Sequence, residues 1–230
     1  MTGNEITLNR LSEHPVAGKT LGRHVHHDVR SRSHLASRAS RVVSVTHETT
    51  GLPLNQETHR CSTAHALCGA MDASPSFSGT LLTEKTAIEI YHRASRLEGE
   101  TPTLQPETGS SGLMACKAAK ELGLISSYEH AFGIDHALEA LVLRPVMTGI
   151  KWYSSFDSPD PATGLVEIAP DAFVRGGHEV LATGIDAENR LVWFWNSWGA
   201  EFGVDGRFCM TFDTWDQLLQ DEGDVTVPVK

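Results

Sequence analysis

A histidine and an asparagine in the C-terminal third of the chain carry the clearest chemical signal. Gly176-Gly177-His178-Glu179-Val180 is followed, eighteen residues after the histidine, by Asn196-Ser197-Trp198-Gly199. An imidazole can take up and return a proton near neutral pH, and an asparagine oxygen bonded to one ring nitrogen aims the other at a nucleophile. A Trp ring can shield that bond from water. The alternative is that His178 and Asn196 are hydrogen-bonded core residues of two strands.

These motifs resemble the papain family of cysteine peptidases, in which a glycine-preceded His opens one strand and Asn-Ser-Trp-Gly ends the next. The family also has an upstream Gln, then five residues, then the nucleophile at the start of a long helix. Gln56 stands six positions before Ser62 in this chain. The resemblance implies that the Gln56 side-chain amide and the backbone N–H of Ser62 stabilise the developing oxyanion. The alternative for Gln56 is a surface loop residue.

The position of the nucleophile departs from the family pattern. The family has a small residue and then Cys, whereas this chain has Cys61 and then Ser62. A serine hydroxyl is far harder to ionise than a thiol, and an Asn partner gives the histidine no negative charge, so Ser62 would lose several orders of magnitude in rate. A one-residue shift, which turns a helical side chain by about 100°, would instead bring Cys61 to His178 and lower the pKa of its thiol.

The resemblance also suggests which residues bind substrate. A glycine-rich segment stands where the family has a loop whose backbone pairs with an extended substrate, although a plain helix-capping turn is an equal reading of it. The candidate substrate-binding residues are Gly109, Ser110, Ser111, Gly112, Gly177 and Trp198.

Four helices and then four strands are expected from the apolar periodicity. The helices are predicted from near Ser62 through Met71, over 84–97 after a Thr83 cap, from a Ser110 or Ser111 cap to Gly123, and over 133–143. The strands are predicted at 146–152, 178–185, 191–196 and 206–212. This order indicates an α+β class, and the resemblance implies a papain-like two-lobed fold. We therefore expect an extended arm over 1–52, a helical lobe over 53–143, a β-rich lobe over 144–230 and the site in the cleft between the lobes.

Charge is unevenly distributed along the chain. The net charge is −10, yet residues 1–45 carry 7 Lys and Arg against 3 Asp and Glu. The acidic remainder disfavours nucleic-acid binding. The basic arm, with Arg23 among its arginines, could meet an acidic partner surface or be solvated charge, and His24, His26 and His27 are expected to be solvated or hydrogen-bonded rather than metal ligands.

The sequence excludes several other functional classes. The chain has 230 residues with no apolar run of 18 or more and no signal-like N-terminus, so we expect neither a membrane span nor a secretory signal. No metal, nucleotide or flavin motif is present, so no cofactor is expected. Four scattered cysteines indicate a reducing compartment, although one disulfide stays possible.

Several stretches look closer still to papain-like proteins encoded by phages of actinobacteria, among them Gly22-Arg23-His24-Val25-His26-His27-Asp28 and Trp152-Tyr153-Ser154-Ser155-Phe156-Asp157. This closer resemblance implies that the protein lies in the bacterial cytoplasm during phage production, or in the virion. It also implies that the arm contacts virion proteins and that no pro-peptide is expected. The sequence thus leaves two functions open. One is a hydrolase of peptide or isopeptide bonds that binds a polypeptide substrate, and the other is an inactive relative that binds a partner.

Overall fold

A helical layer and an antiparallel sheet make up the molecule, which a computed structural model describes over residues 6–51, 53–101 and 107–230. The α-helices are α1 (Ser62–Met71), α2 (Glu84–Leu97), α3 (Gly112–Glu121), α4 (Gly133–Leu143) and α5 (Phe212–Gln220). The strands are β1 (Ile6–Asn9), β2 (Val25–Asp28), β3 (Val45–Thr46), β4 (Ser127–Ala131), β5 (Val146–Tyr153), β6 (Val174–Asp186), β7 (Leu191–Trp195), β8 (Arg207–Thr211) and β9 (Asp224–Val229). Short 3-10 helices cover Val29–Ser33 and Ser154–Asp157.

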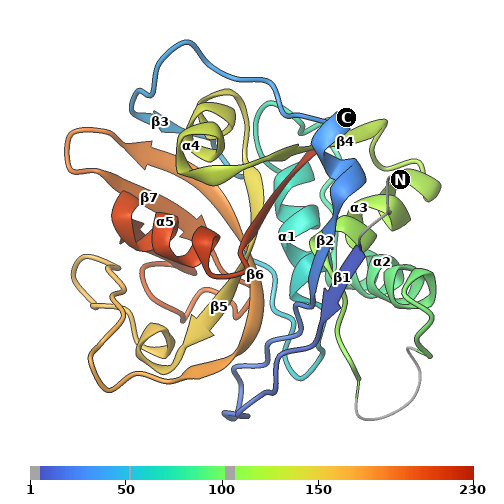
Figure 1. Ribbon diagram of the computed structural model, residues 1–230, viewed down its shortest axis with the longest axis horizontal. Helices are drawn as coiled ribbons and strands as arrows, with labels where there is room; N and C mark the ends of the chain where they lie inside the picture. Colours follow the sequence, from blue (N-terminus) through green and yellow to red (C-terminus); the bar gives the residue numbers. More distant parts are fainter. Residues whose placement is uncertain (1–5, 52, 102–106) are drawn as a thin grey trace.

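The main sheet has the strand order β4-β9-β5-β6-β7-β8, and all of its pairings are antiparallel. In Figure 1 the helices α1, α2 and α3 lie on one side of β5 and β6, whereas α5, β7 and β3 lie on the other. The α+β class and the two-lobed arrangement predicted from the sequence are confirmed.

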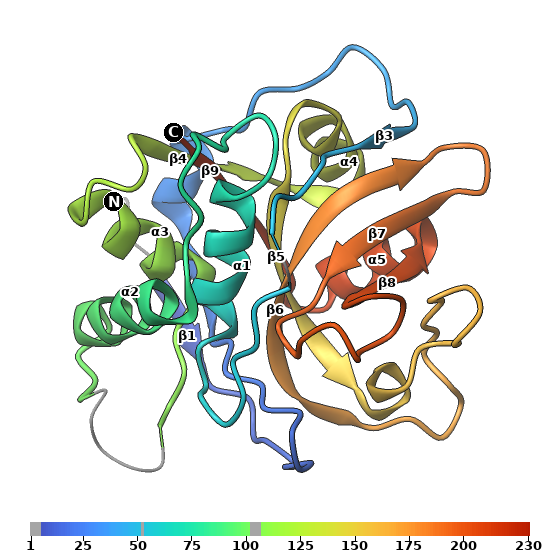
Figure 2. The same ribbon diagram turned by 180° about the vertical axis from the view of Figure 1, so that it is seen from behind.

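The helical lobe is built around α1. Nearly every residue of this helix is buried, because α2 and α3 pack on it from one side and β6 from the other (Figure 2). The neighbouring helices begin at capping residues expected from the sequence. The Thr83 side chain accepts a hydrogen bond from the backbone N–H of Thr86, and the Ser111 hydroxyl accepts one from that of Met114.

The strands β5 and β6 face both lobes, because successive side chains of a strand point to opposite faces. Val180 of β6 packs in the core of the β-rich lobe, whereas Leu181 packs in the core of the helical lobe. Along the same strand, His178 shares the face of Val180 and Glu179 shares the face of Leu181. This alternation decides which lobe each of the two site residues reaches.

The N-terminal arm is more ordered than the sequence suggested. Its β1 and β2 pair with each other, and its β3 pairs with β6 at the edge of the β-rich lobe. The predicted lobe boundary after Leu143 also differs from the packing, since the apolar side chains of α4 belong to the core of the β-rich lobe. The elements β4, β9 and α5 were not predicted.

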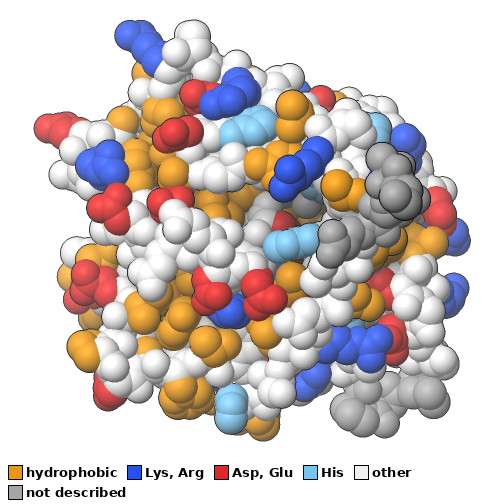
Figure 3. Space-filling view, in the orientation of Figure 1, with side chains coloured by type: hydrophobic (Ala, Val, Ile, Leu, Met, Phe, Trp, Pro, Cys, Tyr) orange, Lys and Arg blue, Asp and Glu red, His pale blue; other side chains and the backbone are white. Residues whose placement is uncertain are grey.

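Four of the six arginines of the arm pair within the molecule. Arg23 is only 2% exposed, so it is neither solvated nor free for an acidic partner. Three others pair with carboxylates: Arg10 with Glu100, Arg30 with Asp28, and Arg38 with Glu139. On the face drawn in Figure 3, basic and acidic side chains are accordingly interspersed.

All four cysteines are free and buried, which removes the disulfide that the sequence left possible. Across the described ranges, none of the helices is long and apolar enough to span a membrane.

Candidate active site

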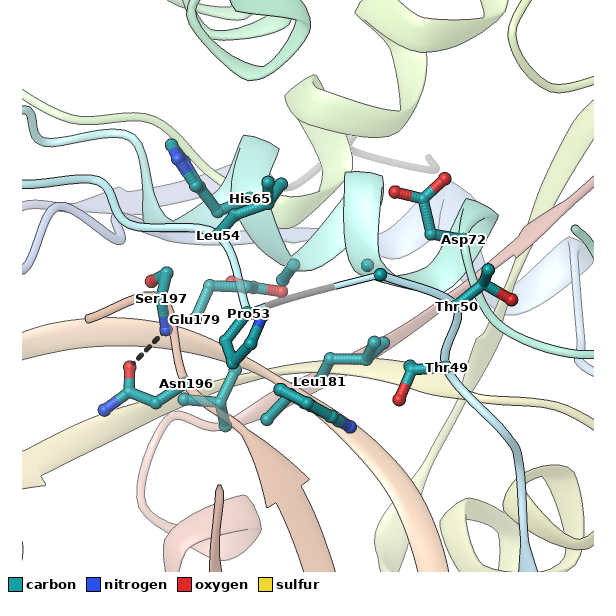
Figure 4. Close-up of a pocket in the computed structure, with 15 residues that line it drawn as sticks. Thr49, Thr50, Pro53, Leu54, His65, Asp72, Glu179, Leu181, Asn196 and Ser197 are labelled. Atoms are coloured by element: carbon teal, nitrogen blue, oxygen red, sulfur yellow. Dashed lines mark hydrogen bonds between the residues drawn. The ribbon is translucent and has the colours of Figure 1, made fainter. Parts of the chain in front are cut away.

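His178 and Asn196 form a buried hydrogen-bonded pair. His178 Nε2 lies 2.7 Å from Asn196 Oδ1, and the same oxygen accepts the backbone N–H of Ser197 at 2.7 Å, drawn as the dashed line in Figure 4. An amide oxygen only accepts, so Nε2 carries the ring proton and Nδ1 of the neutral ring keeps a free lone pair. Among the described residues Nδ1 has no hydrogen-bond partner. The histidine is therefore held with one nitrogen available as a base.

Aromatic rings enclose this pair. The Trp198 ring stacks on the His178 ring at a centroid distance of 5.0 Å, and Trp152 meets it edge-on at 4.9 Å. Burial lowers the pKa of His178 to about 3, and the hydrogen bond to Asn196 only partly opposes that shift. The imidazole is thus neutral at pH 7 while the site is closed to water.

This shift predicts a pH-dependent stability. The folded protein takes up the His178 proton only near pH 3, whereas the unfolded chain takes it up near 6.5. Stability is therefore lost as the pH falls from about 6.5 towards 3. Urea unfolding at pH 6.5 and 5, above the main carboxylate titrations, is expected to show this loss in the wild type and a smaller one in His178→Gln. Equal losses in both proteins would contradict it.

Ser62 lies at the N-terminus of α1 and contacts the strand that carries the histidine, but it makes no hydrogen bond to His178 Nδ1. It is fully buried, and its Oγ accepts a hydrogen bond from the backbone N–H of Glu179 at 3.3 Å. Because Glu179 directly follows His178, this contact holds the hydroxyl against the strand that carries the histidine. The partial positive charge of a helix N-terminus favours an oxyanion at this place.

Cys61 points the other way. Its Sγ lies 3.4 Å from His65 Nδ1, and its side chain belongs to the core of the helical lobe. Burial, with a smaller contribution from the Glu107 carboxylate, raises the pKa of this thiol well above its ordinary value. The lowered thiol pKa expected for a shifted register is therefore wrong, and Ser62 rather than Cys61 faces β6.

Gln56 is buried, not a surface loop residue, and its side-chain amide is fully bonded. Nε2 donates to the carbonyl oxygens of Leu21 at 3.1 Å and of His59 at 2.7 Å, and Oε1 accepts the Ser197 hydroxyl at 2.5 Å. The amide that was predicted to bind an oxyanion thus binds a carbonyl oxygen of the arm.

The arm itself runs through the predicted substrate-binding segments. The backbone N–H of His24 donates to the carbonyl of Ser110 at 2.7 Å, and that of Ser110 donates to the carbonyl of Gly22 at 2.9 Å. On the other side, the N–H groups of Gly22 and Arg23 both donate to the carbonyl of Gly177, at 3.2 and 3.0 Å. Residues 22–24 therefore lie between the two backbone segments that the sequence analysis assigned to substrate.

Glycines allow this close approach. A Cβ on Gly109 would lie 2.3 Å from the Gly22 carbonyl oxygen, and one on Gly177 would lie 2.3 Å from that of Arg23. The Ser111 hydroxyl of the same segment also bonds the buried Glu98 carboxylate at 2.5 Å. That carboxylate also bonds His24 and His26, at 2.7 and 3.5 Å, so these two histidines are hydrogen-bonded as predicted.

Substitution of Gly22 tests whether the arm is held between the Ser110 and Gly177 segments. A Cβ at Gly22 would lie 2.4 Å from the backbone oxygen of Arg60, whereas one at Gly18, also at positive φ, would meet nothing within 4 Å. We expect Gly22→Ala to speed hydrogen exchange at the His24 and Ser110 amides by about tenfold or more, and Gly18→Ala to leave these amides protected. Unchanged protection in Gly22→Ala would show that the arm is not held as described.

A small cavity of about 50 Å³ lies between α1 and the strands behind the site (Figure 4). Asn196 and Ser197 line one end of it and Asp72 and Thr50 line the other. It has room for a few waters but not for a peptide.

Sequence reasoning missed three contributors to the site: Trp152, Glu179 and the Leu21–His24 segment. A charged residue directly after His178 in an otherwise apolar strand was the one available signal, since a buried carboxylate calls for a partner. No local pattern links Leu21 or Arg23 to residues more than 30 positions away.

Comparison with known proteins agrees with this architecture. No protein-family profile matches the chain. An uncharacterized peptidase C1-like protein of Acanthamoeba polyphaga mimivirus is 34% identical over 34% of this chain and 26% of its own length. Cysteine proteinase 3 of Solanum lycopersicum is 30% identical over 48% of this chain and 33% of its own length. The matched stretches thus span about a quarter to a third of these relatives.

A solved structure extends the likeness to the whole fold. Xylellain, a cysteine protease from Xylella fastidiosa, superposes with a TM-score of 0.72 over 94% of this chain and 98% of its own, at 19% identity. The buried His178–Asn196 pair lies in this fold beside the N-terminus of the central helix. The chain therefore has the papain-like fold.

Proposed function

We propose that this chain is a papain-like hydrolase of peptide or isopeptide bonds in which Ser62 stands at the position of the nucleophile. The observation that carries the proposal is the His178–Asn196 pair, held at 2.7 Å with Nδ1 free, beside the N-terminus of α1. The comparisons with cysteine proteases support it at the level of the fold. The retained residues Gln56 and Trp198 support it as well.

The reaction follows from these positions. His178 Nδ1 removes the Ser62 hydroxyl proton as Oγ attacks the substrate carbonyl, and Asn196 keeps the ring oriented. The oxyanion is stabilised by the backbone N–H of Ser62 and, once the Leu21 carbonyl has left, by the Gln56 amide. His178 then gives its proton to the leaving amine, and water hydrolyses the resulting ester by the same route in reverse.

The hydrolase proposal is tested with a fluorophosphonate, on which an activated serine oxygen displaces fluoride from phosphorus. We expect mass spectrometry to find the phosphonyl group on Ser62 in the Gly22→Ala protein, and His178→Ala in that background to abolish it. His65→Ala is the matched control, because this second buried histidine faces Cys61 and its loss should leave the labelling intact. Absence of a label on Ser62 in the folded Gly22→Ala protein would refute the proposal.

A second candidate function is binding without turnover. It is favoured by one specific observation, the serine at a position where the fold's chemistry needs a thiol, together with a cleft that already holds an extended segment of the chain. This candidate predicts that peptides bind the Gly22→Ala protein and are released unchanged. Hydrolysis that depends on His178 would exclude it.

Three further points stay predictions from the sequence. They are the origin in a phage of actinobacteria, the location in the bacterial cytoplasm or the virion, and the contact of the arm with virion proteins. They rest on the stretches Gly22–Asp28 and Trp152–Asp157. Detection of this chain by mass spectrometry in purified virions would support the virion contact, and its absence from them would count against it.

A further inference from the structure

A buried acidic pocket beside the candidate active site holds the side chain of Arg23. The Arg23 guanidinium is fully shielded from solvent, forms an ion pair with Asp224 and donates to the carbonyl oxygen of Glu222 at 2.7 Å. Its Nε and Nη1 have no hydrogen-bond partner among the described residues. The guanidinium therefore uses only part of its donor capacity.

A second carboxylate belongs to the same pocket. Glu179 is 1% exposed, and neither of its carboxylate oxygens has a partner among the described residues. Burial and the neighbouring Asp224 raise the pKa of Glu179, and the charge of Arg23 opposes that rise. A buried carboxylate without a hydrogen bond is costly, so the pocket favours an occupant that brings a positive charge and several donors.

Two glycines make room for the occupant. A Cβ on Gly149 would lie 2.4 Å from Arg23 Nε, 2.9 Å from Asp224 Oδ2 and 2.9 Å from Glu179 Oε2. A Cβ on Gly112 would lie 2.5 Å from Glu179 Oε1. Any larger residue at either position would close the pocket, which reaches from the cleft into the space between α3, β5 and β9.

The pocket lies next to the candidate active site. Glu179 directly follows His178, and its backbone N–H donates to Ser62 Oγ at 3.3 Å. The backbone of the arm on either side of Arg23 bonds Ser110 and Gly177, the segments expected to bind an extended substrate. Arg23 therefore lies where a side chain of a bound polypeptide would enter.

We infer that this pocket, formed by Glu179, Asp224, Gly149 and Gly112, selects an arginine side chain of the polypeptide that binds the cleft, and that Arg23 occupies it while the cleft is empty of substrate. The inference rests on the proposed function for the identity of the cleft. Arginine is favoured over lysine because its planar fork can address Asp224 and the Glu222 carbonyl together, as Arg23 does, whereas an ammonium group is a single point of charge. The alternative is that the pocket only anchors the arm.

Binding measurements on the full-length chain separate these readings without requiring turnover. The protein carries Gly22→Ala, which displaces the backbone of the arm, Arg23→Ala, which empties the pocket, and Ser62→Ala, which prevents hydrolysis. The probes are hexapeptides of alternating Gly and Ser in which a single Arg is moved through the positions, and the same set with citrulline, the neutral isostere of arginine. In at least one position we expect the Arg peptide to bind about 10- to 100-fold more tightly than its citrulline counterpart, the scale of one charge-assisted hydrogen bond.

A variant of the pocket serves as the control. Asp224→Asn in the same background is expected to remove most of the difference between Arg and citrulline, and methylguanidinium is expected to compete with the Arg peptide. Equal affinities for Arg and citrulline at every position, or no binding of either set, would overturn the inference. If the Arg preference appears while Ser62 is never labelled by the fluorophosphonate, the hydrolase proposal fails and the arginine pocket stands.

Discussion

Ser62→Cys is expected to raise the rate of peptide hydrolysis by roughly 10²- to 10⁴-fold over the wild type. A thiol ionises near neutral pH more readily than a hydroxyl, and the N-terminus of α1 stabilises the thiolate. Asn196 gives His178 no negative charge, so a serine at this position receives little help in losing its proton. The increase is measured with a fluorogenic peptide library, using the Gly22→Ala background so that the arm does not mask it.

Two double variants identify the residues that cause the increase in the rate of hydrolysis. His178→Ala combined with Ser62→Cys should lose most of the gained activity, because the ring that shares the proton is gone. Cys61→Ser combined with Ser62→Cys should keep it, because the thiol of Cys61 lies in the helical core. A folded Ser62→Cys protein that hydrolyses no faster than the wild type would contradict this expectation.

Trp152→Ala is expected to lower the free energy of unfolding by about 3–5 kcal/mol, the range for removal of a large buried aromatic side chain. Trp152 is fully buried in the core of the β-rich lobe, and its indole N–H donates to Asp157 Oδ1 at 2.9 Å. Its ring contacts several others of the β-rich lobe, namely Phe156, His178, Trp198, Phe202 and Phe208. Urea unfolding of the purified proteins measures the loss.

Trp193→Ala is the matched control, since this tryptophan of β7 is only half-buried and stacks under Arg207. It should cost less than half as much as Trp152→Ala. A comparable cost for both substitutions would mean that the aromatic cluster around His178 is not the stabilising centre of the β-rich lobe.

Local signals were sufficient for the elements that surround the site. The helix from Ser62 begins at its expected residue because its apolar period is clear, although its N-cap residue Cys61 makes no side-chain capping bond. The strand that contains His178 was predicted in the right region, but it begins at Val174 rather than at His178. The strands β4 and β9 escaped prediction because they pair with each other across about 100 residues of sequence, with no hairpin turn between them to mark the pairing. The helix α5 follows β8 without a break, so its apolar residues merged with the strand pattern.

The candidate site was predictable only in part. The sequence predicted His178, Asn196 and Gln56 because their spacing matches that of the motifs of the papain family. The structure brings these three residues together. The direction of Cys61 was not predictable, because a one-residue change of register at a helix start exchanges the core for the cleft. The role of Arg23 depends on contacts with Asp224, 201 positions away, for which the sequence holds no local sign.

Position 62, and not position 61, faces the strand that carries His178. The most direct test is alkylation of folded Ser62→Cys protein, in the Gly22→Ala background, with a small thiol electrophile at pH 7, followed by peptide mapping. We expect rapid modification at position 62, slowed by His178→Ala, while Cys61 stays unmodified until the protein is unfolded. Preferential modification of Cys61 in the folded protein would contradict it.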